Sequence, residues 1–173
     1  YRMPSVGWYQ TYRVNGEWHI NMIDEIAHKT NIKTDELAAM IKAKPYRVAR
    51  YYGDPAGLQA SSQSGVGDIE IFRKKGILVN TITDKASRSI SAGINHVRGF
   101  IENANSERYL HLNNNCIGMA EDLESYRYPE ADGKDLKSEP LKDGYHDHGC
   151  DQLRYFFINH FPIKNREIKV RNR

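Results

Sequence analysis

The sequence has no apolar run long enough to cross a membrane and no signal-peptide pattern, so we expect neither a membrane partner nor export. It has only two cysteines, Cys116 and Cys150, which are too few for a disulfide framework and are typical of a reducing compartment. It also lacks a Gly-x-x-x-x-Gly-Lys-Ser/Thr phosphate loop, so we do not expect these 173 residues to hydrolyse ATP by that route.

The sequence also has little net charge of either sign, except at its C-terminal end. The net charge is +3, but residues 164–173 contain five Lys/Arg and one Glu, a net charge of +4 that leaves −1 for the rest. We therefore predict one domain over residues 1–162 and a basic C-terminal tail over residues 163–173. Contact with nucleic acid would have to come from local patches or through bound metal ions.

The pattern of apolar residues predicts an α/β order of elements. Asn15-Gly16 is a strong hairpin signal between two β-rich segments, and Ile90, Ile94 and Val97 recur at helical spacing. The strands are predicted at 6–14, 17–27, 47–52, 77–82 and 109–112. The helices are predicted at 34–42, 70–75, 89–101 and 117–126, with a terminal helix that ends near residue 160.

Residues 145–157, Tyr-His-Asp-His-Gly-Cys-Asp-Gln-Leu-Arg-Tyr-Phe-Phe, combine acids and imidazoles with an apolar helical pattern. On a helix, Asp147 and His148 lie three or four positions from Asp151, so the three share one solvated face. The opposite face is apolar and suits a core: Cys150, Leu153 and Phe157. Two interpretations are open for the polar face, a helix start that acids stabilise and a site for a divalent metal ion.

A zinc site is a further interpretation of the same segment. His146, His148 and Cys150 alternate along the sequence, which would place them on one face of a strand. They lack the paired ligand spacing of structural zinc motifs, so we rank this interpretation below the other two.

Other charged residues have both a structural and a functional interpretation. Asp54 follows the strand predicted at 47–52, where it would either initiate a turn before Pro55 or contribute to a site at the strand end. Lys85 and Arg88 precede a helix, where they would either bind phosphate or be solvated. The acids of the helix at 117–126 are expected to be solvated: Glu121, Asp122 and Glu124.

The order of these segments resembles the C-terminal nuclease domain of a tailed-phage large terminase subunit, the DNA-packaging motor. The resemblance covers residues 5–160, and its most specific part is His148-x-x-Asp151-x-Leu-Arg-Tyr. The other matching stretches are Tyr-Gly-Asp-Pro-Ala at 52–56, residues 69–76, Asp84-Lys85 before a Ser-Ile helix, and residues 116–128.

The resemblance implies a ribonuclease-H-like mixed sheet flanked by helices, with its first strand missing from this sequence. In the family that strand ends in the first catalytic Asp, a few residues before a segment like Arg2-Met-Pro-Ser-Val6, so we expect it upstream of Tyr1. The resemblance also implies that Asp54 and Asp151 bind two Mg²⁺ or Mn²⁺ ions, with Asp147 or His148 completing the site. Two such ions can clamp the attacking and leaving oxygens of a phosphodiester.

The expected activity is metal-dependent cleavage of double-stranded viral DNA, with Lys85 and Arg88 on the DNA backbone. The implied partners are an upstream terminase ATPase domain, the small terminase subunit and the portal or procapsid. The implied location is the host cytoplasm, outside the mature virion. Two alternatives stay open, another ribonuclease-H-like nuclease such as a resolvase or transposase core, and a non-catalytic module for DNA binding or motor docking.

Overall fold

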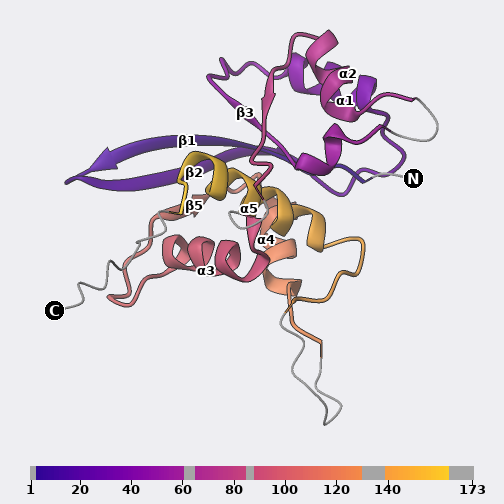
Figure 1. The fold of residues 1–173 in the computed structure, drawn as a ribbon. Helices are drawn as coiled ribbons and strands as arrows, with labels where there is room; N and C mark the ends of the chain where they lie inside the picture. Colours follow the sequence, from indigo (N-terminus) through magenta and orange to yellow (C-terminus); the bar gives the residue numbers. More distant parts are fainter. Residues whose placement is uncertain (1–2, 61–64, 85–87, 130–138, 164–173) are drawn as a thin grey trace, which may run out of the picture.

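The computed structural model describes residues 3–60, 65–84, 88–129 and 139–163 (Figure 1). The chain opens with an antiparallel hairpin of β1 (Val6–Val14) and β2 (Glu17–Ile26). Asn15 and Gly16 both have positive φ, 52° and 90°, which a two-residue hairpin turn of this hand requires. The predicted hairpin is therefore confirmed. Strand β5 (Leu110–Leu112) pairs in parallel with β2, which makes a mixed sheet in the order β1-β2-β5.

A second sheet of two short parallel strands lies apart from the first (Figure 1). It consists of β3 (Tyr51–Tyr52) and β4 (Val79–Asn80), which pair with each other. Both are shorter than the strands predicted at 47–52 and 77–82, so those boundaries were wrong. Within the described residues each strand has a neighbour on one side only, and β-branched composition alone does not extend a strand that lacks a partner.

Two helices pack beside the second sheet. They are α1 (Thr34–Ala43) and α2 (Asp68–Lys74), and a short 3₁₀ helix η1 (Pro55–Leu58) lies against α2. The apolar side chains of α1 meet the hairpin and Ile77 in a single core cluster, against which Phe72 of α2 packs: Trp8, Ile26, Leu37, Ala38, Ile41 and Ile77.

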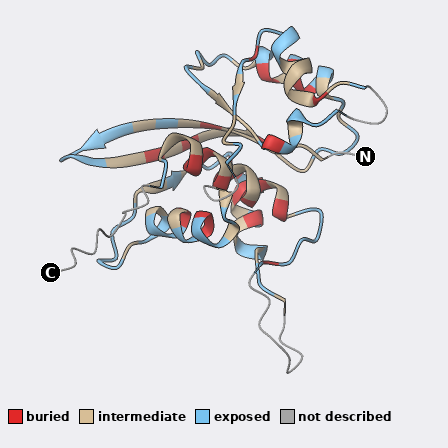
Figure 2. Cartoon of the chain, viewed as in Figure 1, coloured by how far each residue is buried: buried red, intermediate tan, exposed pale blue. Residues whose placement is uncertain are grey.

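Three further helices cover the other face of the mixed sheet: α3 (Ile90–Ile101), α4 (Ile117–Ser125) and α5 (Asp147–His160). Figure 2 shows buried residues gathered on these helices and along the hairpin, whose tip is exposed. Leu153 and Phe157 are almost fully buried and Cys150 is buried, so the predicted apolar face of α5 is confirmed. None of the helices in the described parts of the chain is both long and apolar enough to span a membrane.

Helix α5 connects the two sheets. Its contacts extend to β1, to β3 and to both neighbouring helices, α3 and α4. The Phe156 ring stacks on Tyr9 of β1 at 4.0 Å, and the ring of His160 lies within hydrogen-bonding distance of the Tyr52 hydroxyl of β3, at 3.1 Å. Side chains of the mixed sheet and of the β3–β4 sheet therefore come together on α5.

Candidate active site

Asp54 lies two residues after β3 and begins η1. Its Oδ1 accepts a hydrogen bond from the backbone N–H of Ala56 at 2.8 Å, and Pro55 follows at the first helical position. The carboxylate remains exposed. The turn-initiating role is thus confirmed, and the same conformation leaves an oxygen of Asp54 available at the end of the strand.

Asp151, on the second turn of α5, is held by cations. Arg154 donates to its Oδ1 at 2.7 Å from one terminal nitrogen and at 3.3 Å from Nε, and Nζ of Lys142 lies 3.6 Å from its Oδ2. Arg154 is only 4% exposed. Burial opposes its charge, but the Asp151 carboxylate outweighs burial and raises the pKa of the Arg154 guanidinium. Asp151 therefore has a fixed orientation and compensating positive charge.

Tyr155 connects Asp151 to Asp54. The guanidinium carbon of Arg154 lies 4.5 Å from the centre of the Tyr155 ring, and the Tyr155 hydroxyl lies close enough to Asp54 for the charge of Asp54 to act on it. Burial raises the pKa of the Tyr155 hydroxyl, and the charge of Asp54 raises it further. Four side chains thus run in sequence from Asp54 through Tyr155 and Arg154 to Asp151, so the structure brings two of the predicted acids into one region.

Asp147 differs from the prediction of a solvated face. It is 6% exposed, and its Oδ1 accepts a hydrogen bond from the backbone N–H of Gly144 at 2.7 Å. Such a bond fixes the chain at the start of α5. Of the two interpretations of the polar face, a helix start that an acid stabilises is therefore the one that describes Asp147. His148 is the next residue on the same helical turn and is half-buried.

Asp122 was also predicted to be solvated, and this prediction was wrong. It is 1% exposed, and its Oδ1 lies 2.7 Å from Nε2 of His28, whose ring stacks on Tyr145 at 4.4 Å. Burial raises the pKa of the Asp122 carboxyl, while the hydrogen bond with His28 lowers it. A sequence signal existed, because Asp122 stands three residues after the buried Met119 and so shares its face of the helix.

The carboxylates at this site offer oxygen atoms of the kind that hard cations bind, but there are few of them. Carboxylate oxygens are the ligands that Mg²⁺ and Mn²⁺ prefer. Among the described residues, however, no three His, Cys, Asp or Glu side chains converge closely enough to hold an ion. Asp54 and Asp151 therefore offer suitable donor atoms, but the described residues do not by themselves form a metal site.

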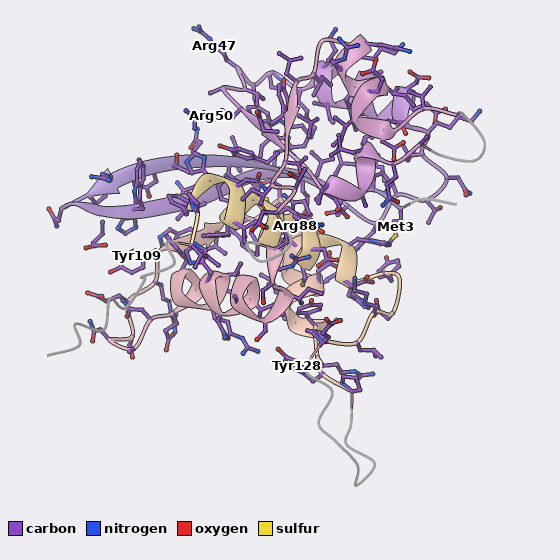
Figure 3. All side chains as sticks on the ribbon, viewed as in Figure 1. Met3, Arg47, Arg50, Arg88, Tyr109 and Tyr128 are labelled. Carbon is purple, nitrogen blue, oxygen red and sulfur yellow. The ribbon has the colours of Figure 1, made fainter. Side chains whose placement is uncertain are left out.

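The remaining predicted residues separate into three cases. Lys85 lies outside the described residues. Arg88, labelled in Figure 3, uses its Nε to donate to the backbone carbonyl of Asp84 at 3.4 Å. The zinc interpretation needed a strand at 146–150, but residues from Asp147 onward are helical, and burial raises the pKa of the Cys150 thiol to about 12.

The mixed sheet flanked by helices has the fold of a large-terminase nuclease domain, which is ribonuclease-H-like. The solved structure it matches is the g2p (large terminase) nuclease domain from the bacteriophage SPP1 with bound Mn, with a TM-score of 0.59 and 15% sequence identity. The match covers 92% of this chain and 81% of that domain. No family model and no curated protein matches the sequence. The resemblance predicted from sequence is thus confirmed for the fold.

Proposed function

We propose that this chain is the nuclease domain of a large terminase and that it cleaves double-stranded DNA with the help of two Mg²⁺ or Mn²⁺ ions. The observation that carries the proposal is the linked set Asp54, Tyr155, Arg154 and Asp151, which joins the end of β3 to α5 within a terminase-nuclease fold. The matched SPP1 domain was solved with bound Mn, which supports a divalent ion as the cofactor.

In this proposal the two acids have different roles. Asp54 is exposed and offers a carboxylate oxygen that its turn does not use. Asp151 is oriented by Arg154, which keeps its carboxylate in one position. A pair of bound ions would supply an activated water and would stabilise the departing 3′ oxygen. Asp147 and His148, on the preceding turn of α5, are the nearest candidates in sequence for further ligands.

DNA would be held through its phosphates. Arg88 precedes α3, and Lys85 and the tail at 163–173 add positive charge elsewhere in the sequence. Phosphate contacts position a duplex without reading its sequence, so cleavage by this domain alone should be largely non-specific. Site choice would then depend on the partners proposed for a packaging motor, which are the ATPase domain, the small subunit and the portal or procapsid.

The test is plasmid nicking in Mn²⁺ with the Asp54→Asn variant. Asparagine retains the oxygen that accepts the Ala56 N–H, so η1 should persist while the metal-binding charge is lost. We expect nicking to fall at least about a hundredfold, in line with the loss of one metal ligand. The matched control is Asp35→Asn, which removes an exposed acid from α1. Equal nicking by the wild type and Asp54→Asn would overturn the proposal.

The same preparations separate the alternatives. Preferential cleavage of branched over duplex DNA would indicate a resolvase-like enzyme. DNA binding without Mn²⁺ binding, measured by calorimetry in a polypeptide that includes sequence upstream of Tyr1, would indicate a non-catalytic DNA-binding or motor-docking module. The upstream sequence matters here because the resemblance places the first catalytic acid there.

A further inference from the structure

Two histidines on neighbouring strands of the mixed sheet face each other. Nδ1 of His19, on β2, lies 3.5 Å from Nε2 of His111, on β5. The ring planes are 3° apart, and the ring centroids are 5.8 Å apart. The distance between the centroids exceeds the distance between the nitrogens by roughly the radii of the two rings, so the rings lie edge to edge with these nitrogens between them.

The backbone of the sheet holds this pair in place. His111 pairs in parallel register with Asn21, and His19 lies two residues before Asn21 on the same face of the sheet. Backbone hydrogen bonds of 2.8 and 3.0 Å join β2 to the residues just before and just after β5. The separation of the two imidazoles is therefore set by strand pairing and not by the position of a loop.

The two histidines differ in their freedom to rotate. The ring of His19 is flanked by two tyrosine rings, that of Tyr12 on β1 at 5.6 Å between centroids and that of Tyr109, labelled in Figure 3, at 5.3 Å. His19 is half-buried, whereas His111 is exposed. His19 thus has a restricted orientation, and His111 can rotate to meet a ligand placed beside it.

Neither histidine of the pair is committed to a carboxylate. His28 and His146 are each paired with an aspartate, through contacts of 2.7 and 2.6 Å. Among the residues that the structure describes, the ring nitrogens of His19 and His111 form a hydrogen bond only with each other. One of the facing nitrogens donates that bond and the other accepts it, so a single shared proton occupies the space between them. A cation that displaces this proton would meet two nitrogen lone pairs.

The spacing suits a metal ion that prefers imidazole ligands. Zn²⁺ binds imidazole nitrogen at about 2.0–2.1 Å, so an ion bound to both nitrogens at their present separation would hold them at an angle of about 115°, close to tetrahedral. The ion would lie to one side of the line that joins the nitrogens, and rotation of the exposed His111 ring would direct its lone pair there. Mg²⁺ and Mn²⁺ prefer oxygen ligands, so this pair differs in chemistry from the candidate active site.

We propose that His19 and His111 bind one Zn²⁺ ion, which ties the short strand β5 to β2 at the edge of the mixed sheet. Among the described residues no third His, Cys, Asp or Glu converges on the pair. Two positions of a tetrahedral ion would therefore be taken by water or by a ligand from another molecule, and binding would be weaker than at a structural zinc site with four protein ligands. The inference uses only this pair of side chains, so it stands whether or not the protein cleaves DNA.

Calorimetric titration with Zn²⁺ tests the proposal. The variants His19→Gln and His111→Gln each remove one ligand, and each should lower the affinity of this site at least about tenfold, because even groups that only orient a ligand contribute that much. The matched control is His146→Gln, which removes an imidazole that is paired with Asp143 and should leave the affinity unchanged. A wild type that binds no Zn²⁺, or equal affinity in the wild type and both ligand variants, would overturn the proposal.

NMR and urea denaturation give independent readouts. In a Zn²⁺ titration the ring signals of His19 and His111 should shift before those of the other histidines. Because the ion binds the folded sheet, Zn²⁺ should raise the urea midpoint of the wild type and leave that of His111→Gln nearly unchanged. His111 is exposed, so His111→Gln should be as stable as the wild type without Zn²⁺. Signal shifts confined to other histidines, or an equal rise of the midpoint in the two proteins, would place the ion elsewhere and contradict the proposal.

Discussion

Tyr155 of α5 lies near Asp54, which begins η1 in a distant part of the sequence, and the charge of Asp54 acts on the Tyr155 hydroxyl. Tyr155 also packs under the guanidinium of Arg154, which is paired with Asp151. One aromatic side chain therefore lies between Asp54 and the arginine that orients Asp151.

Tyr155→Phe should lower the affinity for Mn²⁺ as well as the free energy of unfolding. The variant keeps the ring beneath Arg154 but removes the hydroxyl that meets Asp54, at a cost of about 0.5–1.5 kcal/mol in unfolding free energy. We expect Mn²⁺ affinity, measured by calorimetry, to fall about threefold to tenfold because Asp54 loses its fixed position. The control is Tyr128→Phe at an exposed tyrosine. Unchanged affinity in Tyr155→Phe would mean that Tyr155 does not position Asp54.

Asp151→Asn should destabilise the fold as well as the site. It would leave the buried guanidinium of Arg154 without its carboxylate, which costs about 3–5 kcal/mol for a buried pair. Urea denaturation measures this loss. The double variant Asp151→Asn with Arg154→Met should recover much of the stability, and failure to recover it would show that the ion pair is not the cause. Because Asp151→Asn also destabilises the fold, a loss of activity in this variant is weaker evidence for a role in metal binding than a loss in Asp54→Asn.

Gly149→Ala should destabilise α5, although alanine favours helices. A Cβ at position 149 would come within 1.9 Å of Oδ2 of Asp122, a buried carboxylate paired with His28. We expect a loss of about 1–3 kcal/mol in unfolding free energy, as for other overpacked sites. The matched control is Gly99→Ala in α3, where no atom lies within 4 Å, and where alanine should stabilise by up to about 1 kcal/mol. Equal effects at the two glycines would contradict the close approach of α4 and α5.

Stability should fall as the pH rises above about 10, the ordinary pKa of tyrosine. Burial raises the pKa of the Tyr9, Tyr126 and Tyr155 hydroxyls, so the folded state retains protons that the unfolded chain releases. The unfolded state then binds fewer protons, and unfolding free energy decreases with increasing pH. Urea titrations between pH 8 and 11 measure the slope. Tyr9→Phe should reduce it.

Local signals account for the parts of the fold that were predicted correctly. Asn15-Gly16 specifies a hairpin through its own backbone preferences, and the spacing of Cys150, Leu153 and Phe157 defines the buried face of one helix. The predictions that were wrong concern residues whose structure depends on partners far away in the sequence. Residues 47–50 have strand-like composition, but none of the described strands pairs with them, and Asp122 is buried because His28, far away in sequence, provides its hydrogen bond.

The sequence predicts which residues form the candidate site but not how they are arranged. The sequence motif identified Asp54 and Asp151 through family resemblance, and their link through Tyr155 and Arg154 became visible only when β3 and α5 were placed together. Nothing in the spacing of residues 145–157 distinguishes Asp147, which binds the backbone N–H of Gly144, from Asp151, which pairs with a cation.

The placement of both acids beside α5 has a mechanical consequence. Asp151 is part of that helix, and Asp54 lies near Tyr155 on its next turn. If the two sheets rock relative to each other, Asp54 and Asp151 should travel together with the helix, and the distance between their carboxylates should vary less than the distance between the sheets.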